Sequence, residues 1–125
     1  MNSWESIFDW ILDKDEIDNS FNSYGRHHKW DELRDEILSQ KGVECVGCGS
    51  KTGLTIHHIV PVSDPIKGRE LELELSNLIV VCHKSDRFKN WSCHKSICHF
   101  NSWSRINPNA WEDLIYFRGN FDKKD

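Results

Sequence analysis

The feature that most constrains how this chain can fold is a C-x2-C pair, Cys45 and Cys48. Such a pair presents two thiolates from one tight turn, and zinc needs two further ligands to complete a tetrahedron. The 125-residue sequence has five cysteines, an odd number, and no secretion signal, so a disulfide framework is not expected. We therefore expect a structural zinc site that is closed by Cys82 together with Cys93, Cys98 or a nearby histidine.

A tandem histidine pair follows the cysteine pair. Apolar and polar residues alternate from Leu54 to His57, which predicts a strand that ends at Pro61. Adjacent residues on a strand point to opposite faces, so His57 and His58 cannot both pack into one core. A pair at a strand end suits divided roles, one imidazole binding a metal and the other acting as a base. The simpler alternative is a hydrogen-bonded histidine packed beside the zinc knuckle.

The spacing of apolar residues predicts helices on both sides of a two-stranded core. One helix is expected over residues 3–17 and a second over Trp30–Leu38, with Gly42 just after its end. The apolar run Leu78–Val81 predicts the second strand, and residues 62–70 read as a loop. Further helices are expected near residues 94–99 and 110–116.

Charge is distributed unevenly along the chain. The formal net charge of −4 argues against a protein that coats nucleic acid. Residues 1–24 hold six acidic side chains against one lysine, whereas residues 83–105 hold five basic side chains against one aspartate. No apolar run approaches the roughly 20 residues of a membrane span. These observations lead us to expect a cytoplasmic protein without membrane contact.

Four sequence blocks stand in a distinctive order. They are Cys45-x2-Cys48, His57-His58-Ile59-Val60-Pro61, Asn77-Leu78-Ile79-Val80-Val81-Cys82 and Cys93-His94-Lys95. In this order they resemble the HNH endonuclease family, whose pattern reads C-x2-C, H-H-I-x-P, N-L-x-x-L-C and a closing C-H. The resemblance covers roughly residues 30–99, because the helix from Trp30 is similar to the one that precedes the family's knuckle. It implies an α+β fold with a small zinc-stabilised ββα-metal core (HNH, or His-Me finger) and flanking helices.

The resemblance also implies a role for each matching residue. His57 and His94 would bind a catalytic divalent cation, Mg²⁺ or Mn²⁺. His58 would be the general base that takes a proton from water, and Asn77 would hold the loop that orients His58. A separate structural zinc would be held by Cys45, Cys48, Cys82 and Cys93.

One departure from the family pattern concerns the second cysteine pair, which is usually C-x2-C-H. We interpret residues 83–92 as an insertion, so that Cys93 and His94 become the closing pair. The rival interpretation keeps the family spacing, makes Asp86 the metal ligand and completes the zinc site with Cys98 or a histidine. A third option adds Cys98 or His99 as a ligand, since Cys98 lies four residues after His94 on a helix.

The function implied by the resemblance is metal-dependent hydrolysis of DNA phosphodiester bonds, with DNA as the partner. The basic segment suits contacts with flanking phosphates, and Phe88 and Trp91 within it suit either base stacking or, more simply, core packing. The candidate DNA-binding residues are Lys84, Arg87, Lys89 and Lys95.

Two other functions remain open from sequence. A non-catalytic zinc-stabilised module that binds nucleic acid or protein is the main alternative, although it gives no reason for a base beside a metal ligand. A redox protein using Cys45 and Cys48 would need a βαβ context that the pattern lacks. We divide the chain into an acidic helix and linker (1–28), suited to meeting a protein partner, and a nuclease domain with a C-terminal extension (29–125).

Overall fold

The computed structural model describes residues 27–122 of the chain. The helix expected over residues 3–17 lies outside them, and the domain boundary at residue 28 stays a prediction. In chain order the elements are α2 (Trp30–Leu38), β1 (Leu54–His58), α3 (Gly68–Leu71), the 3-10 helix η2 (Leu75–Asn77), β2 (Leu78–Cys82), the π-helix η3 (His94–Cys98) and α4 (Ala110–Asp122). The predicted α+β class is confirmed. No helix within residues 27–122 is long and apolar enough to cross a membrane.

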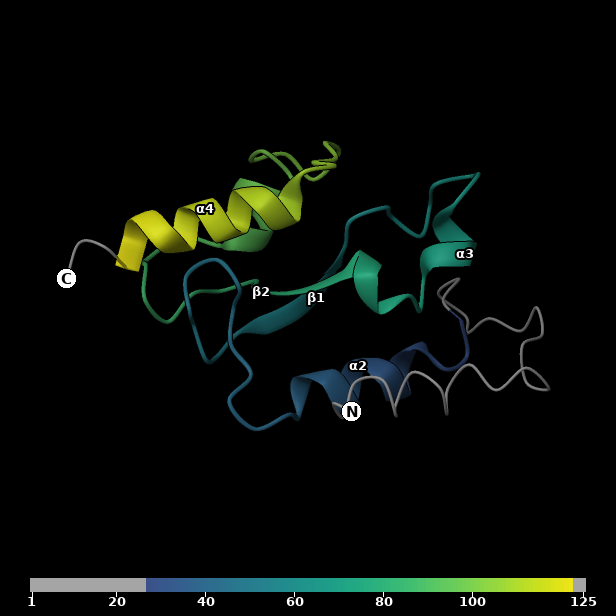
Figure 1. Ribbon diagram of the computed structural model, residues 1–125, viewed down its shortest axis with the longest axis horizontal. Helices are drawn as coiled ribbons and strands as arrows, with labels where there is room; N and C mark the ends of the chain where they lie inside the picture. Colours follow the sequence, from purple (N-terminus) through teal and green to yellow (C-terminus); the bar gives the residue numbers. More distant parts are fainter. Residues whose placement is uncertain (1–26, 123–125) are drawn as a thin grey trace.

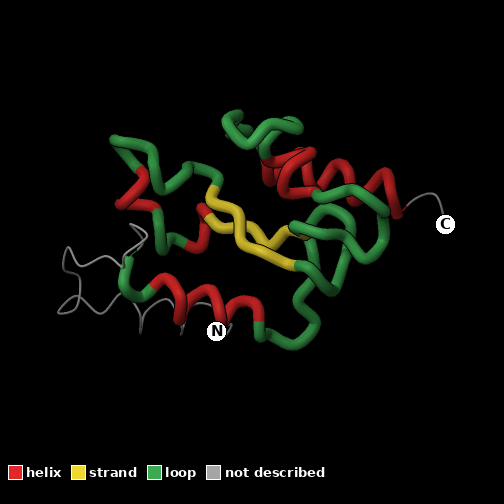
Figure 2. The backbone as a smooth tube through the Cα atoms, turned by 180° about the vertical axis from the view of Figure 1, so that it is seen from behind, coloured by secondary structure: helices red, strands yellow, loops and turns green. Residues whose placement is uncertain are grey.

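The two strands form an antiparallel sheet at the centre of the molecule, with helices on both sides (Figures 1 and 2). Ile56 lies opposite Val80, and His57 lies opposite Ile79. Because side chains alternate along a strand, the first pair shares one face of the sheet and the second pair shares the other. The two histidines of the tandem pair therefore belong to different layers.

One face of the sheet is covered by α2, which packs on Ile56 and Val80. The helix forms as its apolar spacing predicts, and Leu33 and Ile37 on its inner side are almost completely buried. Full burial of such side chains contributes about 1.5–3 kcal/mol each. This layer orients the residues that surround His58.

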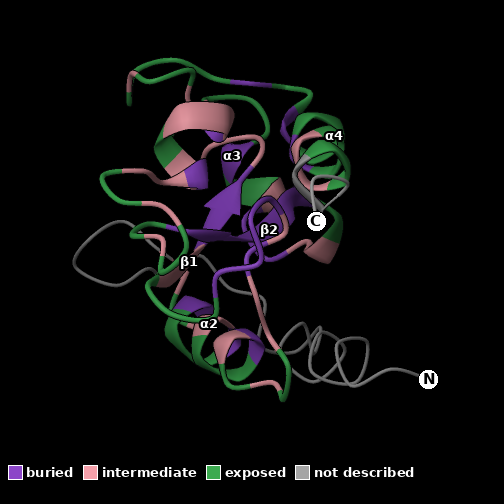
Figure 3. Cartoon of the chain, turned by 90° about the vertical axis from the view of Figure 1, so that its left-hand side faces the viewer, coloured by how far each residue is buried: buried purple, intermediate pink, exposed green. Residues whose placement is uncertain are grey.

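The other face is covered by η3 and α4 and contains the cysteines. Ile79 and Val81 from β2 join Ala110 and Leu114 from α4 in this second core. Figure 3 shows that burial is concentrated in the strands and in the segments that lead into them, while the outer sides of the helices are exposed. The cysteine cluster is thus part of a core and not an appendage.

Three boundaries differ from the sequence predictions. β1 ends at His58 instead of Pro61, because the amides of Ile59 and Val60 bond to the carbonyl and Oδ1 of Asn77 at 2.9 and 2.8 Å. The expected loop over residues 62–70 contains the start of α3. The last helix continues past residue 116 to Asp122.

Candidate metal centres and active site

Four cysteines from three parts of the chain form one cluster. Each is completely buried, and their sulfur atoms all lie within 4.8 Å of one another. The sulfur atoms of Cys48 and Cys82 are 3.7 Å apart. That matches the edge of about 3.8 Å in a tetrahedron whose zinc–sulfur bonds are about 2.3 Å. The members of the cluster are Cys45, Cys48, Cys82 and Cys93.

The surroundings of the cluster favour thiolates held by a cation. The amide of Cys93 donates to Sγ of Cys82 at 3.2 Å, and the indole of Trp91 donates to Sγ of Cys93 at 3.5 Å. Hydrogen bonds from the neighbouring thiols, Cys45 first, hold the pKa of Cys48 well below its usual range. The same crowding, again with Cys45 first, raises the pKa of Cys93 well above it. Four thiols this close cannot all ionise unless a cation neutralises them, so the residues fit a structural zinc.

The zinc knuckle is joined to α4 by close packing at Gly47. A Cβ there would lie 2.8 Å from Sγ of Cys93 and 2.8 Å from Cδ2 of Leu114, so the turn has no room for a side chain. Arg118 of α4 donates to the carbonyl of Cys45 at 3.2 Å and to the carboxylate of Glu44 at 2.8 Å. Together these contacts hold the last helix against the cysteine cluster.

Three histidines form a second cluster on the same face of the sheet. His57 comes from β1, His94 begins η3, and His99 directly follows it. One ring nitrogen from each lies within 4.8 Å of the others. The ring centroids are 5.1 Å apart for His57 and His94, and 4.9 Å from each of these to His99. Side chains from two elements thus converge on one point.

The nitrogens of this cluster are suited to a metal ion. Within the described part of the chain, buried Nε2 of His57 and Nδ1 of His94 have no hydrogen-bond partner. Burial, followed by neighbouring imidazoles, lowers the pKa of His57 to about 3 and that of His94 to about 4, so both rings are neutral near pH 7. Nδ1 of His99 donates to the carbonyl of Arg105 at 2.8 Å, which leaves Nε2 with the lone pair. The three rings fit a divalent cation.

His58 lies on the opposite face of β1, in the layer formed with α2. Its Nε2 is 2.9 Å from the backbone carbonyl of Glu72, and its ring packs on Trp30 with centroids 4.6 Å apart. A carbonyl only accepts hydrogen bonds, so Nε2 carries the proton and Nδ1 of the neutral ring carries the lone pair. The side chain is 8% exposed.

Asn77 connects the chain after β1 to the segment before β2. Its Oδ1 accepts from the amide of Val60 at 2.8 Å, and its Nδ2 donates to the carbonyls of Val60 and Leu71 at 3.0 and 3.2 Å. The side chain is buried. These bonds hold the turn that follows His58.

Comparison with known proteins identifies the segment that carries both clusters. Residues 45–101 match the family model of the HNH endonucleases. This segment belongs to the HNH endonuclease family. Searches of curated proteins and of solved structures returned no match. The HNH segment includes His57, His58, Asn77 and η3, whereas α2 and α4 lie outside it.

Within the HNH segment, the structure brings His94 and not Asp86 to His57. Residues 83–92 form no regular element between β2 and the turn that leads into η3. Asp86 is exposed, and its carboxylate accepts hydrogen bonds from the amide of Lys51 at 2.9 Å and the hydroxyl of Thr52 at 3.3 Å. The aspartate therefore closes the loop after the zinc knuckle.

The candidate DNA-binding residues of the HNH segment separate into two groups. Lys84, Lys89 and Lys95 line one hollow, and Arg87 is not among its lining residues. Phe88 packs near Trp91, and Trp91 stacks on Phe117 of α4 with centroids 5.6 Å apart. These two aromatic side chains of the basic segment are partly buried and pack against the core.

Two residues of this site were not assigned by sequence reasoning. His99 was considered only as an optional added ligand, because helical spacing from His94 points to Cys98. In the structure Cys98 is buried in the core instead. Trp103 lies beyond the family motifs, yet its ring contacts both His94 and His99, with centroids 5.0 and 5.2 Å away. An exposed aromatic residue close to a histidine-rich motif was the available signal.

Proposed function

We propose that this chain is a metal-dependent endonuclease that hydrolyses phosphodiester bonds in DNA. The observation that carries the proposal is the cluster of three imidazoles, two of which have buried nitrogens without a partner among the described residues. Three protein ligands leave coordination positions for a water and a phosphate oxygen, as a catalytic site needs. The family of the surrounding segment supports the same chemistry.

The donor set favours a particular kind of cation. His57, His94 and His99 supply three nitrogens and no carboxylate. Imidazole suits transition metals, whereas Mg²⁺ prefers oxygen ligands and keeps its water. We therefore infer that Mn²⁺ or another transition metal binds here more tightly than Mg²⁺. When bound, the cation offsets the negative charge that develops on the phosphate and stabilises the leaving oxygen.

His58 is the proposed general base. The bond from its Nε2 to the Glu72 carbonyl supports this role, because a carbonyl acceptor requires the proton to be on Nε2 and so makes Nδ1 the basic nitrogen of the neutral ring. His57 and His58 occupy the last two positions of β1 and leave the strand in opposite directions. We place the reacting phosphate beyond the end of the strand, where the turn held by Asn77 begins. Asn77 is then a positioning residue for His58.

One observation favours a non-catalytic nucleic-acid-binding module as the alternative. The His58 ring is nearly buried and is covered by Trp30 of α2. If this packing does not open toward a substrate, His58 is a structural side chain, and the two metal clusters only stabilise a binding surface.

A plasmid-nicking assay distinguishes the two functions. We expect the zinc-loaded full chain to cut supercoiled DNA when Mn²⁺ is added, and His58→Ala to slow cutting by about 10²–10⁴-fold, the usual effect of removing a positioned base. His28→Ala, at an exposed histidine ahead of α2, is the matched control and should keep the wild-type rate. Zinc content and circular dichroism should be unchanged in both. An active His58→Ala variant would remove the base assignment, and a wild-type chain that fails to cut DNA with every divalent cation tested would favour the binding module.

A further inference from the structure

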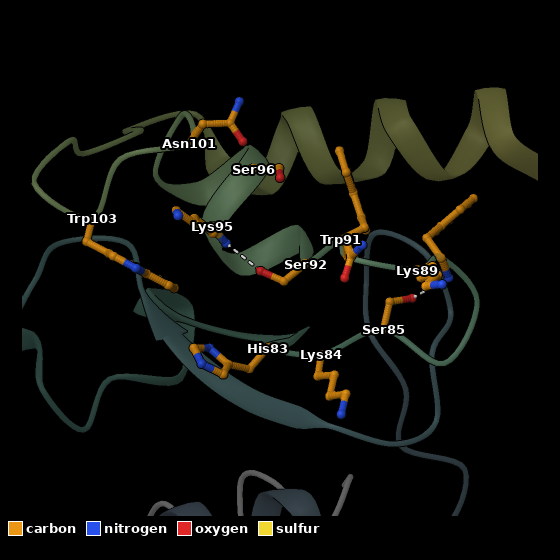
Figure 4. A pocket seen from close by; sticks show the side chains of 12 residues that line it. His83, Lys84, Ser85, Lys89, Trp91, Ser92, Lys95, Ser96, Asn101 and Trp103 are labelled. Carbon is orange, nitrogen blue, oxygen red and sulfur yellow. Dashed lines mark hydrogen bonds between the residues drawn. The ribbon is translucent and has the colours of Figure 1, made fainter.

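A hollow of about 690 Å³ lies beside the histidine cluster, between the end of β2 and η3 (Figure 4). Pockets of about 300–1,000 Å³ enclose molecules of the size of a nucleotide. Three of its lining side chains are the exposed lysines Lys84, Lys89 and Lys95, and no carboxylate from residues 27–122 is among its lining residues. The hollow therefore favours an anionic ligand.

One wall of the hollow is an aromatic surface that the fold leaves open. Trp103 is 49% exposed, and its ring stacks on His83 with centroids 5.5 Å apart and planes 26° from parallel. Nζ of Lys95 lies 5.9 Å from the centre of the same ring. Trp91, which also lines the hollow, is only partly exposed and packs against the core. Trp103 is thus the more exposed of the two tryptophans that line the hollow.

Trp103 connects the hollow to the candidate catalytic centre. The Trp103 ring contacts His94 and His99, two of the three proposed ligands of the cation. In Figure 4 the Trp103 side chain extends toward His83. A group stacked on Trp103 therefore lies next to two of the three histidines of the cluster.

We propose that this hollow binds an unpaired nucleotide of the strand that is cut, with its base on Trp103 and its flanking phosphates near the three lysines. The inference rests on the proposed function and names its substrate as DNA with an unpaired base at or beside the cut. A base in a continuous duplex has both faces covered by its neighbours, so it cannot stack on a side chain unless it leaves the helix. Stacking on aromatic side chains is the usual way in which proteins bind unpaired bases without reading their sequence.

Binding without cleavage tests the proposal. The zinc-loaded full chain is mixed, with no added divalent cation, with four labelled probes: a thymidine decamer, an abasic strand of the same length, a paired hairpin whose strands are joined by a linker without bases, and that hairpin with one bulged thymidine. Fluorescence anisotropy gives each dissociation constant, and a gel verifies that the probes stay intact. We expect the decamer and the bulged hairpin to bind at least about 5-fold more tightly than the abasic strand and the paired hairpin.

Trp103→Ala should weaken binding of the decamer by about 5- to 150-fold and leave binding of the abasic strand unchanged. Trp111→Ala is the matched control, because Trp111 is 47% exposed on α4 and lines a different hollow. It should change no constant by more than about 2-fold. Lys89→Ala should weaken binding of all probes alike and reduce the salt dependence, since it removes a phosphate contact and not a base contact.

Equal affinity of the wild-type chain for paired and unpaired probes, or a Trp103→Ala variant that binds the decamer normally, would overturn the proposal and leave a simple phosphate groove. The result is independent of catalysis: a chain that prefers unpaired bases but never cuts DNA retains this inference and loses the proposed function. A chain that cuts duplex DNA but does not prefer unpaired bases retains the proposed function and loses this inference.

Discussion

The two ligand clusters lie on one face of the sheet and each takes one of two adjacent residues, Cys93 and His94, yet they differ in how the fold encloses them. Cys93 belongs to the cysteine cluster and His94 to the histidine cluster. All four cysteines are completely buried, whereas His94 and His99 are only half-buried. A closed set of four ligands is typical of structural zinc, and an open set of three is typical of catalytic metals. The comparison teaches that access, as much as ligand type, separates the two functions.

The largest expected effect is loss of the fold when the closed cluster is broken. Cys45→Ser should remove the zinc and unfold the HNH segment, because zinc binding to such sites supplies about 10–16 kcal/mol that is coupled to folding. Cys98→Ala is the control, since Cys98 is equally buried but lies outside the cluster. It should keep about one zinc per chain. Elemental analysis and thermal melts measure both, and a Cys45→Ser variant that stays folded and loaded would refute a structural role for the cluster.

The open cluster should behave in the opposite way. His94→Ala should leave zinc content and folding almost unchanged but should abolish the stabilisation that Mn²⁺ gives the wild-type chain. That stabilisation is about 2.7 kcal/mol when Mn²⁺ is present at 100 times its dissociation constant. His99→Ala should weaken Mn²⁺ binding as well, whereas Asp86→Ala should not.

Melting curves with and without Mn²⁺, together with titration calorimetry, measure these effects. If Asp86→Ala removed the response to Mn²⁺ and His94→Ala kept it, the chain would follow the family spacing after β2 instead of the register described above. Equal loss of folding in His94→Ala and Cys45→Ser would remove the distinction between the two clusters.

The smallest effect concerns the packing of the knuckle against α4. Gly47→Ala should destabilise the chain by about 1–3 kcal/mol, because the added Cβ would collide with Sγ of Cys93 and with Leu114. Gly119→Ala on α4 meets no atom within 4 Å, and it should stabilise the helix by up to about 1 kcal/mol. Chemical denaturation compares the two variants. A Gly47→Ala variant as stable as the wild-type chain would show that the packing between the knuckle and α4 can move apart to admit a methyl group.

Sequence spacing predicted the parts of the site that depend on local chemistry. The C-x2-C knuckle, the strand before His58 and the helix from Trp30 each follow from neighbours within a few residues, and the structure has a cluster, a strand and a helix at these positions. Catalytic roles for His58 and Asn77 stay predictions. The N-terminal acidic helix falls outside the described residues.

Local spacing failed where a non-standard turn intervened. An α-helical interval from His94 leads to Cys98, but η3 is a π-helix, whose bonds run from residue i to i+5. The wider turn brings His99 to the cluster and sends Cys98 into the core. No propensity rule predicts a single π-turn, because its cost is offset only by the packing around it.

The sequence by itself determined which ligands are available and in what order: a cysteine knuckle, a tandem histidine, an asparagine before the second strand and a later Cys-His pair. Only the tertiary structure decided how they are grouped. The fold brings Cys93 to the knuckle and His94 to His57 at the end of the segment 83–92. It leaves Asp86 on the surface and places Trp103 in the lining of a basic hollow. The physical reason is that ligand grouping depends on distances between segments far apart in the chain, which are set by packing on the two faces of the sheet and not by spacing along the sequence.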